Sequence, residues 1–223
     1  MKQGAREEIL EKLKAAPKKA IPPRPHIPPL SELTMTQEEL IERFTKNLVE
    51  ETGVVHRVPD MQAAVDKLTE IVKAEGLKKV MVSTDDVIAP LDLPAWGKRN
   101  NVQVMTPKDF ADRNSFRNAV FDEAEAGITG ADFAVAESGT LGLIHNKNQA
   151  RLVSLAPILH IAIVPGERIV PVYERVTEKL FAKKEQLPSQ FIFITGPSMT
   201  GDIQGALFKG MHGPRRIIVI FIG

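Results

Sequence analysis

Two segments of this sequence place glycine, hydroxyl and carboxyl groups directly after a short apolar run. The first is Glu137-Ser138-Gly139-Thr140, which follows residues 134–136, and the second is Gly196-Pro197-Ser198-Met199-Thr200-Gly201-Asp202, which follows residues 191–195. Buried strands of α/β proteins that end in such residues present backbone N–H groups and hydroxyls to anionic ligands. Two such loops in one chain predict a binding site for a small anion.

The first loop contains the most reactive side chain of the two segments. Glu137 opens the pattern Glu-x-Gly-x-x-Gly, whose glycines allow a tight turn that exposes the carboxylate. A carboxylate in this position can serve as a general base or a nucleophile, with Ser138, Gly139 and Thr140 binding the ligand beside it. In the alternative interpretation, Glu137 is structural and either pairs with an arginine such as Arg151 or accepts hydrogen bonds from loop amides.

The second loop has the residue types of a helix start. Gly196 allows a close approach of the ligand, and Ser198, Thr200 and Asp202 are N-cap residues for a helix predicted over residues 203–208. The N–H groups and hydroxyls at such a helix start can bind a carboxylate or a phosphate. The same residues can also act as caps without any ligand.

A histidine lies near the end of the chain, in Gly210-Met211-His212-Gly213-Pro214. It precedes the apolar run 217–222, so it shares a sheet edge with the second loop if that run is a strand parallel to residues 191–195. His212 would then act as a base or hydrogen-bond donor, with Gly213 beside the ligand. A histidine in a Gly/Pro turn is also a common structural feature, and His145 and His160 are weaker candidates still.

Strands and helices alternate through the part of the chain that must position these loops. Strands are predicted over residues 54–58, 79–83 and 102–105, and helical segments over 60–76 and 84–97. This alternation of strands and helices predicts a mostly parallel sheet with helices on both faces. The second half adds a helix over residues 171–184 and the predicted strands 133–136, 141–145, 160–164, 191–195 and 217–222. Continuous hydrophobicity in residues 191–194 and 217–222 predicts strands that are covered on both faces.

The first fifty residues have a different character. A helix is predicted over residues 6–15, and six prolines follow within residues 17–29. A second helix is predicted over residues 36–51, with Leu40, Ile41, Phe44 and Leu48 on one face. The sequence therefore predicts a helical and Pro-rich N-terminal arm, residues 1–50, and an α/β domain, residues 51–223. The arm is expected to pack on the core or on another subunit, which allows a homo-oligomer.

The composition excludes several classes of function. A formal net charge of +1 over 223 residues gives no basic field for nucleic acid, and the absence of cysteine excludes thiolate metal sites and iron–sulfur clusters bound by this chain. No apolar run approaches the roughly 18 to 20 residues that span a bilayer, and the N-terminus lacks the apolar core of a signal peptide, so a cytoplasmic location is expected. No dinucleotide fingerprint is present, which disfavours a self-contained NAD enzyme.

Three motifs in order carry a resemblance to a known family. They are the segment 127–141, which includes Thr129-Gly130 and Glu137-Ser138-Gly139-Thr140, then Thr195-Gly196-Pro197-Ser198 through Asp202, then residues 210–214. Over about residues 40–223 the chain resembles the lactate utilization domain (LUD) family, and within it the small members without cysteine. The family's Gly-Pro-Ser-x-Thr motif is expected to hold a basic residue where this chain has Met199, and Arg215 or Arg216 could supply the missing guanidinium.

The resemblance implies a function as well as a fold. It implies a subunit of a cytoplasmic complex that oxidises L-lactate to pyruvate, with no cofactor on this chain and iron–sulfur clusters on the partner subunits. It also implies a fold similar to the ribose-5-phosphate isomerase and CoA-transferase superfamily. The catalytic candidates are Glu137 and His212, and the candidates for binding a small carboxylate are Thr129, Ser138, Gly139, Thr140, Gly196, Ser198, Thr200, Asp202 and Gly213.

Two other hypotheses belong to different classes. CoA-transferases resemble the same segment, because their nucleophilic glutamate stands in a Glu-x-Gly-x-x-Gly turn, and such an enzyme would form a glutamyl thioester at Glu137. A non-catalytic assembly or regulatory module is the third hypothesis. It is favoured by the proline-rich segment of the arm, because an extended segment of this kind can lie in a groove of another subunit.

Overall fold

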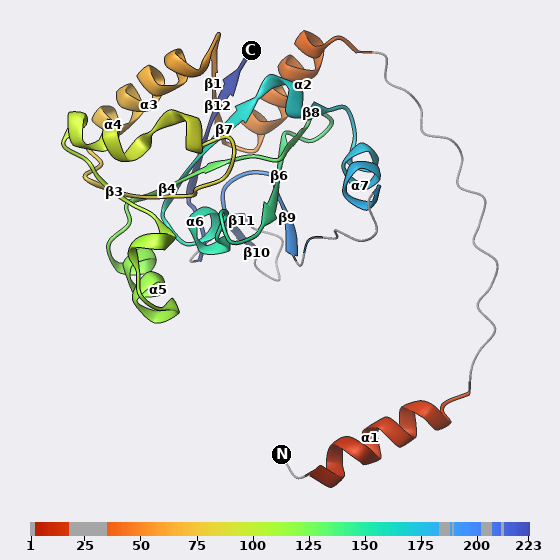
Figure 1. Ribbon diagram of the computed structural model, residues 1–223. Helices are drawn as coiled ribbons and strands as arrows, with labels where there is room; N and C mark the ends of the chain where they lie inside the picture. Colours follow the sequence, from red (N-terminus) through yellow and green to blue (C-terminus); the bar gives the residue numbers. More distant parts are fainter. Residues whose placement is uncertain (1–2, 18–34, 183–187, 189, 202–206, 211) are drawn as a thin grey trace. The chain divides into compact units, whose positions relative to one another are not determined.

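The computed structural model describes residues 3–17, 35–182, 188, 190–201, 207–210 and 212–223 (Figure 1). The chain divides into two units, Met1–Glu32 and Leu33–Gly223. In the first unit, helix α1 (Gln3–Ala15) leaves the apolar side chains of Ile9, Leu10 and Leu13 exposed. Most of the proline-rich segment lies outside the described residues.

Helix α2 (Gln37–Glu50) belongs to the second unit, although the sequence analysis placed it in the arm. It begins with a capping box, in which the Thr36 side chain accepts from the N–H of Glu39 and the Glu39 carboxylate accepts from the N–H of Thr36. The apolar face of the helix is buried in the core, through Leu40, Ile41, Phe44 and Leu48. The larger unit of the structure, Leu33–Gly223, therefore includes this helix.

Six strands form a parallel sheet in the order β1-β12-β7-β4-β2-β3, and every neighbouring pair is parallel. The mostly parallel α/β architecture expected from the sequence is thus confirmed. The last strand of the chain lies inside this sheet, between the first strand and β7. The bounds are β1 (Val54–Val58), β12 (Arg216–Ile222), β7 (Leu159–Pro165), β4 (Ala126–Gly130), β2 (Lys79–Val82) and β3 (Gln103–Met105).

Helices α3 (Met61–Glu75) and α4 (Leu93–Asn100) cover one face of this sheet. Helix α3 begins where the Asp60 carboxylate accepts from the N–H of Ala63 and ends at Gly76, whose φ of +67° is the left-handed conformation that glycine tolerates best. Successive side chains of a strand point to opposite faces, so Val80 and Val82 pack on this side while Met81 packs on the other.

The opposite face is covered by α2, α5 (Arg113–Asp122) and α6 (Arg151–Leu155), together with a second sheet. The second sheet has the order β8-β5-β6-β9, with β5 antiparallel to β6, β6 antiparallel to β9, and β5 parallel to β8. Helix α7 (Tyr173–Phe181) packs on it through Val176. The bounds are β8 (Ile169–Val170), β5 (Phe133–Val135), β6 (Thr140–His145) and β9 (Gln190–Ile194).

This second sheet corrects two expectations about residues 191–195. Strand β9 is not a neighbour of β12 and belongs to a different sheet, so the condition under which His212 would share a sheet edge with the second loop is not met. Strand β9 is also an edge strand, with Phe193 40% exposed, whereas the side chains from Ile217 to Phe221 in β12 are buried. Continuous hydrophobicity correctly indicated two covered faces for β12 but not for β9.

Residues 203–206 of the predicted helix over residues 203–208 lie outside the described residues, and its last two residues belong to a strand. The described residues on either side form two antiparallel strands, β10 (Met199–Gly201) and β11 (Leu207–Lys209), in which Thr200 lies opposite Phe208. Thr200 is therefore a strand residue and not an N-cap, and Asp202 lies outside the described residues. Serine, threonine and glycine occur beside strand ends as well as at helix starts, so the local sequence did not separate the two for Thr200.

Among the described residues, three short 3₁₀ helices lie at Ala89–Leu91, Pro107–Asp109 and Gly166–Arg168. None of the helices in the described parts of the chain has both the length and the apolar character needed to cross a membrane.

Candidate functional site

The structure brings the two glycine-bearing loops together at one end of the second sheet. Thr140 begins β6 and Thr195 follows β9, and these strands are antiparallel neighbours with Leu141 opposite Ile194. The two threonine hydroxyl oxygens lie 2.7 Å apart. The pairing of β6 with β9 therefore joins segments that are more than fifty residues apart in the sequence.

Four hydroxyl groups meet at this point, and we call Ser138, Thr140, Tyr173 and Thr195 the hydroxyl cluster. The Ser138 oxygen lies 2.8 Å from those of Thr140 and Tyr173, and the Thr140 oxygen lies 2.7 Å from those of Tyr173 and Thr195. Each hydroxyl has one proton to donate, so the four contacts engage all four protons. Thr195 is exposed and makes only one of these contacts, so it is the member best able to turn toward a ligand.

Glu137 lies next to the hydroxyl cluster but has a structural partner. One carboxylate oxygen accepts a hydrogen bond of 2.9 Å from the backbone N–H of Tyr173, the first residue of α7. This contact agrees with the structural interpretation of Glu137, in which its carboxylate accepts a hydrogen bond from a backbone amide. Glu137 does not pair with Arg151, whose guanidinium donates to Gln190 instead. The carboxylate compensates an unpaired N–H at the start of a helix whose N-cap residue, Val172, has no polar side chain.

Gly139 is required by the packing of α2 on the loop. Its φ is +64°, and a Cβ atom at this position would collide with the backbone of Leu48 in α2. The side-chain amide of the preceding helical residue, Asn47, donates to the carbonyl of Ala136 at 2.8 Å. Helix α2 therefore covers the first loop, and Gly139 faces that helix, with no room left for a ligand at its α-carbon.

Ser198, His212 and Gly213 are joined in one turn, mainly through their backbone. The Ser198 hydroxyl donates to the backbone carbonyl of His212. The backbone N–H of Ser198 donates to the carbonyl of Pro214, and the carbonyl of Ser198 accepts from the N–H of Gly210, both at 2.7 Å. Gly213 has a φ of +90° and lies against Ser198. The polar atoms of Ser198 thus close the hairpin, and the His212 side chain is exposed.

The remaining candidates of the second loop do not gather around a ligand site either. Gly196 has a φ of +133° and its α-carbon faces Glu51, just after α2. Arg216 forms an ion pair with Glu75, so this arginine does not replace the basic residue expected at Met199. Met199 itself is exposed in β10.

Thr129 lies in the parallel sheet, apart from both loops. It is fully buried in β4, and its hydroxyl oxygen is 2.9 Å from Nε2 of His160 in β7. Burial lowers the pKa of His160 to about 4, so the ring is neutral at pH 7, and its Nδ1 has no hydrogen-bond partner among the described residues. No hydrogen bond in the described parts of the chain connects Thr129 with the hydroxyl cluster.

A buried carboxylate, Asp85, and a half-buried one, Asp132, follow β2 and β4. Asp85 accepts hydrogen bonds from the Ser83 hydroxyl and from the N–H groups of Val87, Ile88 and Gly130. Nearby, burial raises the pKa of Asp132 to about 6, although the N–H of Ile144 and the charge of Arg168 oppose that rise. In the described part of the chain, no three His, Asp or Glu residues are grouped to hold a metal ion.

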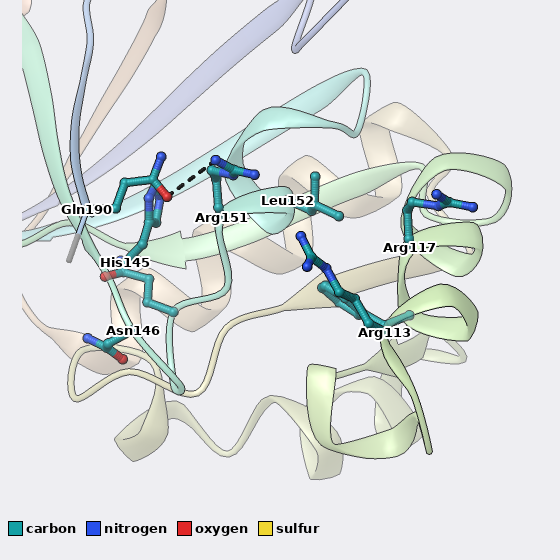
Figure 2. Close-up of a pocket in the computed structure, with 9 residues that line it drawn as sticks. Arg113, Arg117, His145, Asn146, Arg151, Leu152 and Gln190 are labelled. Carbon is teal, nitrogen blue, oxygen red and sulfur yellow. Dashed lines mark hydrogen bonds between the residues drawn. The ribbon is translucent and has the colours of Figure 1, made fainter. Parts of the chain in front are cut away.

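A basic pocket that the sequence analysis missed lies between α5, α6 and the paired ends of β6 and β9 (Figure 2). Its volume is about 480 Å³. Arg113 and Arg117 are one helical turn apart on α5, and this spacing is visible in the sequence. Their proximity to Arg151 and His145 depends on the tertiary fold and has no signal in the local sequence. The lining residues are Arg113, Phe116, Arg117, His145, Asn146, Gln149, Arg151, Leu152 and Gln190.

The fold defines an α/β protein in which a parallel six-stranded sheet is covered on one face partly by a second, mixed sheet. A solved structure with a similar fold is a DUF162 family protein from Deinococcus radiodurans, with a TM-score of 0.61 and 25% identity, covering 85% of this chain and 99% of the other. The family model described as LUD domain matches residues 41–222. The chain belongs to the LUD domain family.

Curated relatives agree with this assignment. A protein named "Lactate utilization protein C" from Halalkalibacterium halodurans is 30% identical over 223 residues, which cover 96% of this chain and 94% of the relative. Proteins of the same name from Anoxybacillus flavithermus and Deinococcus radiodurans are 33% and 30% identical, covering 70% and 92% of this chain and 69% and 87% of their own lengths.

Proposed function

We propose that this chain acts in lactate utilization, as a subunit without iron–sulfur clusters in a complex that oxidises L-lactate to pyruvate. The observation that carries this proposal is its similarity to proteins named for lactate utilization over nearly the whole length of both chains. The sequence has no cysteine, so the clusters that receive the electrons would be held by partner subunits.

The hydroxyl cluster is the proposed contact for a small carboxylate such as lactate. Thr195 offers its hydroxyl from the exposed side, and Glu137 lies beside the cluster with one carboxylate oxygen bound to Tyr173. The other oxygen of Glu137 is proposed to accept the proton of the lactate hydroxyl. Oxidation to a ketone also releases the proton of the C–H bond, which would pass to water, and two electrons, which would pass to the clusters of the partner subunits. His212 is less suited to this role, because it belongs to the turn around Ser198.

The test is to isolate the tagged full chain with its native partners from cells grown on L-lactate. The isolated complex is expected to contain iron and to reduce an artificial electron acceptor with L-lactate, whereas the isolated chain is expected to do neither. Turnover by the isolated chain, or unchanged turnover by a complex without it, would contradict the proposal.

Two variants examine the proposed base within the complex. Glu137→Gln keeps an oxygen for the N–H of Tyr173 but cannot take a proton, so kcat should fall by about 10² or more. Glu50→Gln is the matched control, because Glu50 is an exposed glutamate at the end of α2. Equal rates for both variants would show that Glu137 is not the base. A thioester formed at Glu137 on incubation with acyl-CoA would favour acyl transfer instead.

A further inference from the structure

The basic pocket is assembled from elements that the hydrophobic core holds in place. Helix α5 begins at Asp112, whose carboxylate accepts from the N–H groups of Asn114 and Ser115, and Arg113 and Arg117 follow on one side of the helix. Phe116 of α5 packs against the same buried cluster as Leu152 of α6. The pocket is therefore built on two packed helices and one strand pair, and its arginines extend from ordered backbone.

The positive charges of the pocket are not neutralised by any described residue. None of its three guanidinium groups forms an ion pair with a described residue. The Arg151 guanidinium donates to Gln190 at 3.4 Å, and that of Arg117 donates to Asn118 at 3.5 Å, both at the long limit for a hydrogen bond. The Asp112 carboxylate, adjacent to Arg113 in sequence, is engaged with backbone amides.

The three arginines differ in direction. Figure 2 shows the guanidinium of Arg113 close to Leu152 and that of Arg151 on the side of Gln190, whereas Arg117 is turned away from both. Arg113 and Arg151 both line the pocket and both side chains are exposed, so rotation of these long side chains can bring the two guanidinium groups to one small group. Arg117 adds a positive charge at the rim, where its effect is long-range attraction.

His145 provides a second and independent indication of a ligand. It lines the pocket, is only 7% exposed, and neither ring nitrogen has a hydrogen-bond partner among the described residues. Burial and the charge of Arg151 lower its pKa, so the neutral ring offers one N–H donor. A buried donor without a partner is unfavourable, and a ligand oxygen that reaches the ring would supply the missing partner. The long contact between Arg151 and Gln190 beside the ring is weak enough to open.

We propose that Arg113, Arg151 and His145 bind the phosphoryl group of a small organic phosphate. A phosphoryl group carries roughly −1.5 to −2 charges at pH 7 and three acceptor oxygens, which matches two guanidinium groups and one imidazole N–H. A monocarboxylate such as lactate would leave one of these guanidinium charges unbalanced. Phe116 and Leu152 give the pocket an apolar wall for the organic part of the ligand. This site is separate from the hydroxyl cluster and does not depend on the proposed role in lactate oxidation.

The test is calorimetric titration of the full chain at constant ionic strength with phenyl phosphate, inorganic phosphate, benzoate and L-lactate. Phenyl phosphate should bind most tightly, inorganic phosphate more weakly because it lacks the apolar part, and the two monocarboxylates at least about tenfold more weakly than phenyl phosphate. No binding of phenyl phosphate at a concentration of about 10 mM, which corresponds to less than about 3 kcal/mol, would overturn the proposal. So would equal binding of benzoate.

Three variants and a matched control locate the site. Arg113→Gln and Arg151→Gln should each weaken phenyl phosphate binding at least about tenfold, and His145→Phe, which keeps the ring volume without the N–H, should weaken it less. Arg99→Gln removes the same charge from an exposed position on α4 and should change the affinity by less than about twofold. Arg113 and Arg151 are exposed, so their variants should fold, which thermal unfolding would verify. An equal loss with Arg99→Gln, or no loss with Arg151→Gln, would contradict the site.

Discussion

The backbone N–H of Tyr173 donates a hydrogen bond of 2.9 Å to the carboxylate of Glu137, so the first residue of α7 is tied to the loop between β5 and β6. The same tyrosine joins the hydroxyl cluster through its phenol oxygen, 2.7 Å from the hydroxyl oxygen of Thr140. One residue thus connects a helix start, the most reactive carboxylate of the loop and the hydroxyl groups beside it. Changes at Glu137 should therefore affect stability as well as any chemistry.

We expect Glu137→Ala to lower the free energy of unfolding by about 1 kcal/mol, because it removes the acceptor for an N–H at a helix start. Glu137→Gln should cost less, because its amide oxygen can accept the same hydrogen bond. Urea unfolding of both variants, with Glu50→Ala as the control at an exposed position, measures these values. A loss for Glu50→Ala as large as that for Glu137→Ala would show that the hydrogen bond to Tyr173 contributes nothing.

Gly139→Ala should destabilise the protein by about 3 kcal/mol or more, since it combines backbone strain at positive φ with a collision against Leu48. Gly76→Ala is a matched control, because Gly76 has a similar φ of +67° but nothing within 4 Å of an added Cβ. That control should cost only about 1 kcal/mol, from strain alone. Chemical denaturation of the two variants isolates the packing of α2 on the loop, and equal losses would argue against the close contact.

Thr140 is the centre of the hydroxyl cluster, with contacts to Ser138, Tyr173 and Thr195. Thr140→Val keeps the shape but leaves its neighbours with fewer partners, so it should cost about 1–3 kcal/mol. Thr195→Val removes one contact at an exposed position and should cost less than about 1 kcal/mol. Thermal unfolding of the two variants compares these costs, and the reverse order would mean that the cluster is organised around Thr195.

Local signals in the sequence were sufficient for the elements of the parallel sheet. Helix α3 begins after Asp60 and ends at Gly76, because an N-cap and a left-handed C-cap each depend on a single residue type. The apolar run 217–222 coincides with β12, because a strand covered on both faces needs apolar residues throughout. These features act over a few residues, so pattern and composition carry the information.

The site was less predictable because its contacts are non-local. The contact of Thr140 with Thr195 depends on β6 pairing with β9, and both strands could equally have joined the parallel sheet by their hydrophobicity. Similarly, Arg113 lines a pocket with His145 only because α5 and the end of β6 are brought together by the core. A periodic pattern shows which face of an element is apolar, but it does not show which element will cover that face.

Stability between about pH 4 and 6.5 should reflect two buried groups with opposite effects. Burial lowers the pKa of His160 to about 4, below its ordinary value of 6.5, so the unfolded chain binds more protons in this range and stability falls as the pH falls. Over the whole window this loss amounts to about 3 kcal/mol. His160→Gln should remove it, and the stability of this variant relative to the unmodified protein should therefore rise as the pH is lowered.

Asp132 should act in the other direction. Burial raises its pKa to about 6, above its ordinary value of 3.8, so the folded chain binds more protons between these values and stability rises as the pH falls. In the unmodified protein the two effects oppose each other, and Asp132→Asn should reveal the loss due to His160 as a steeper decline on acidification. Urea unfolding of both variants at several pH values from 6.5 to 4.5 provides the comparison. The comparison uses only the slope of the unfolding free energy against pH, so a loss of stability that is constant with pH does not affect it. Equal slopes for the two variants would contradict the two pKa shifts.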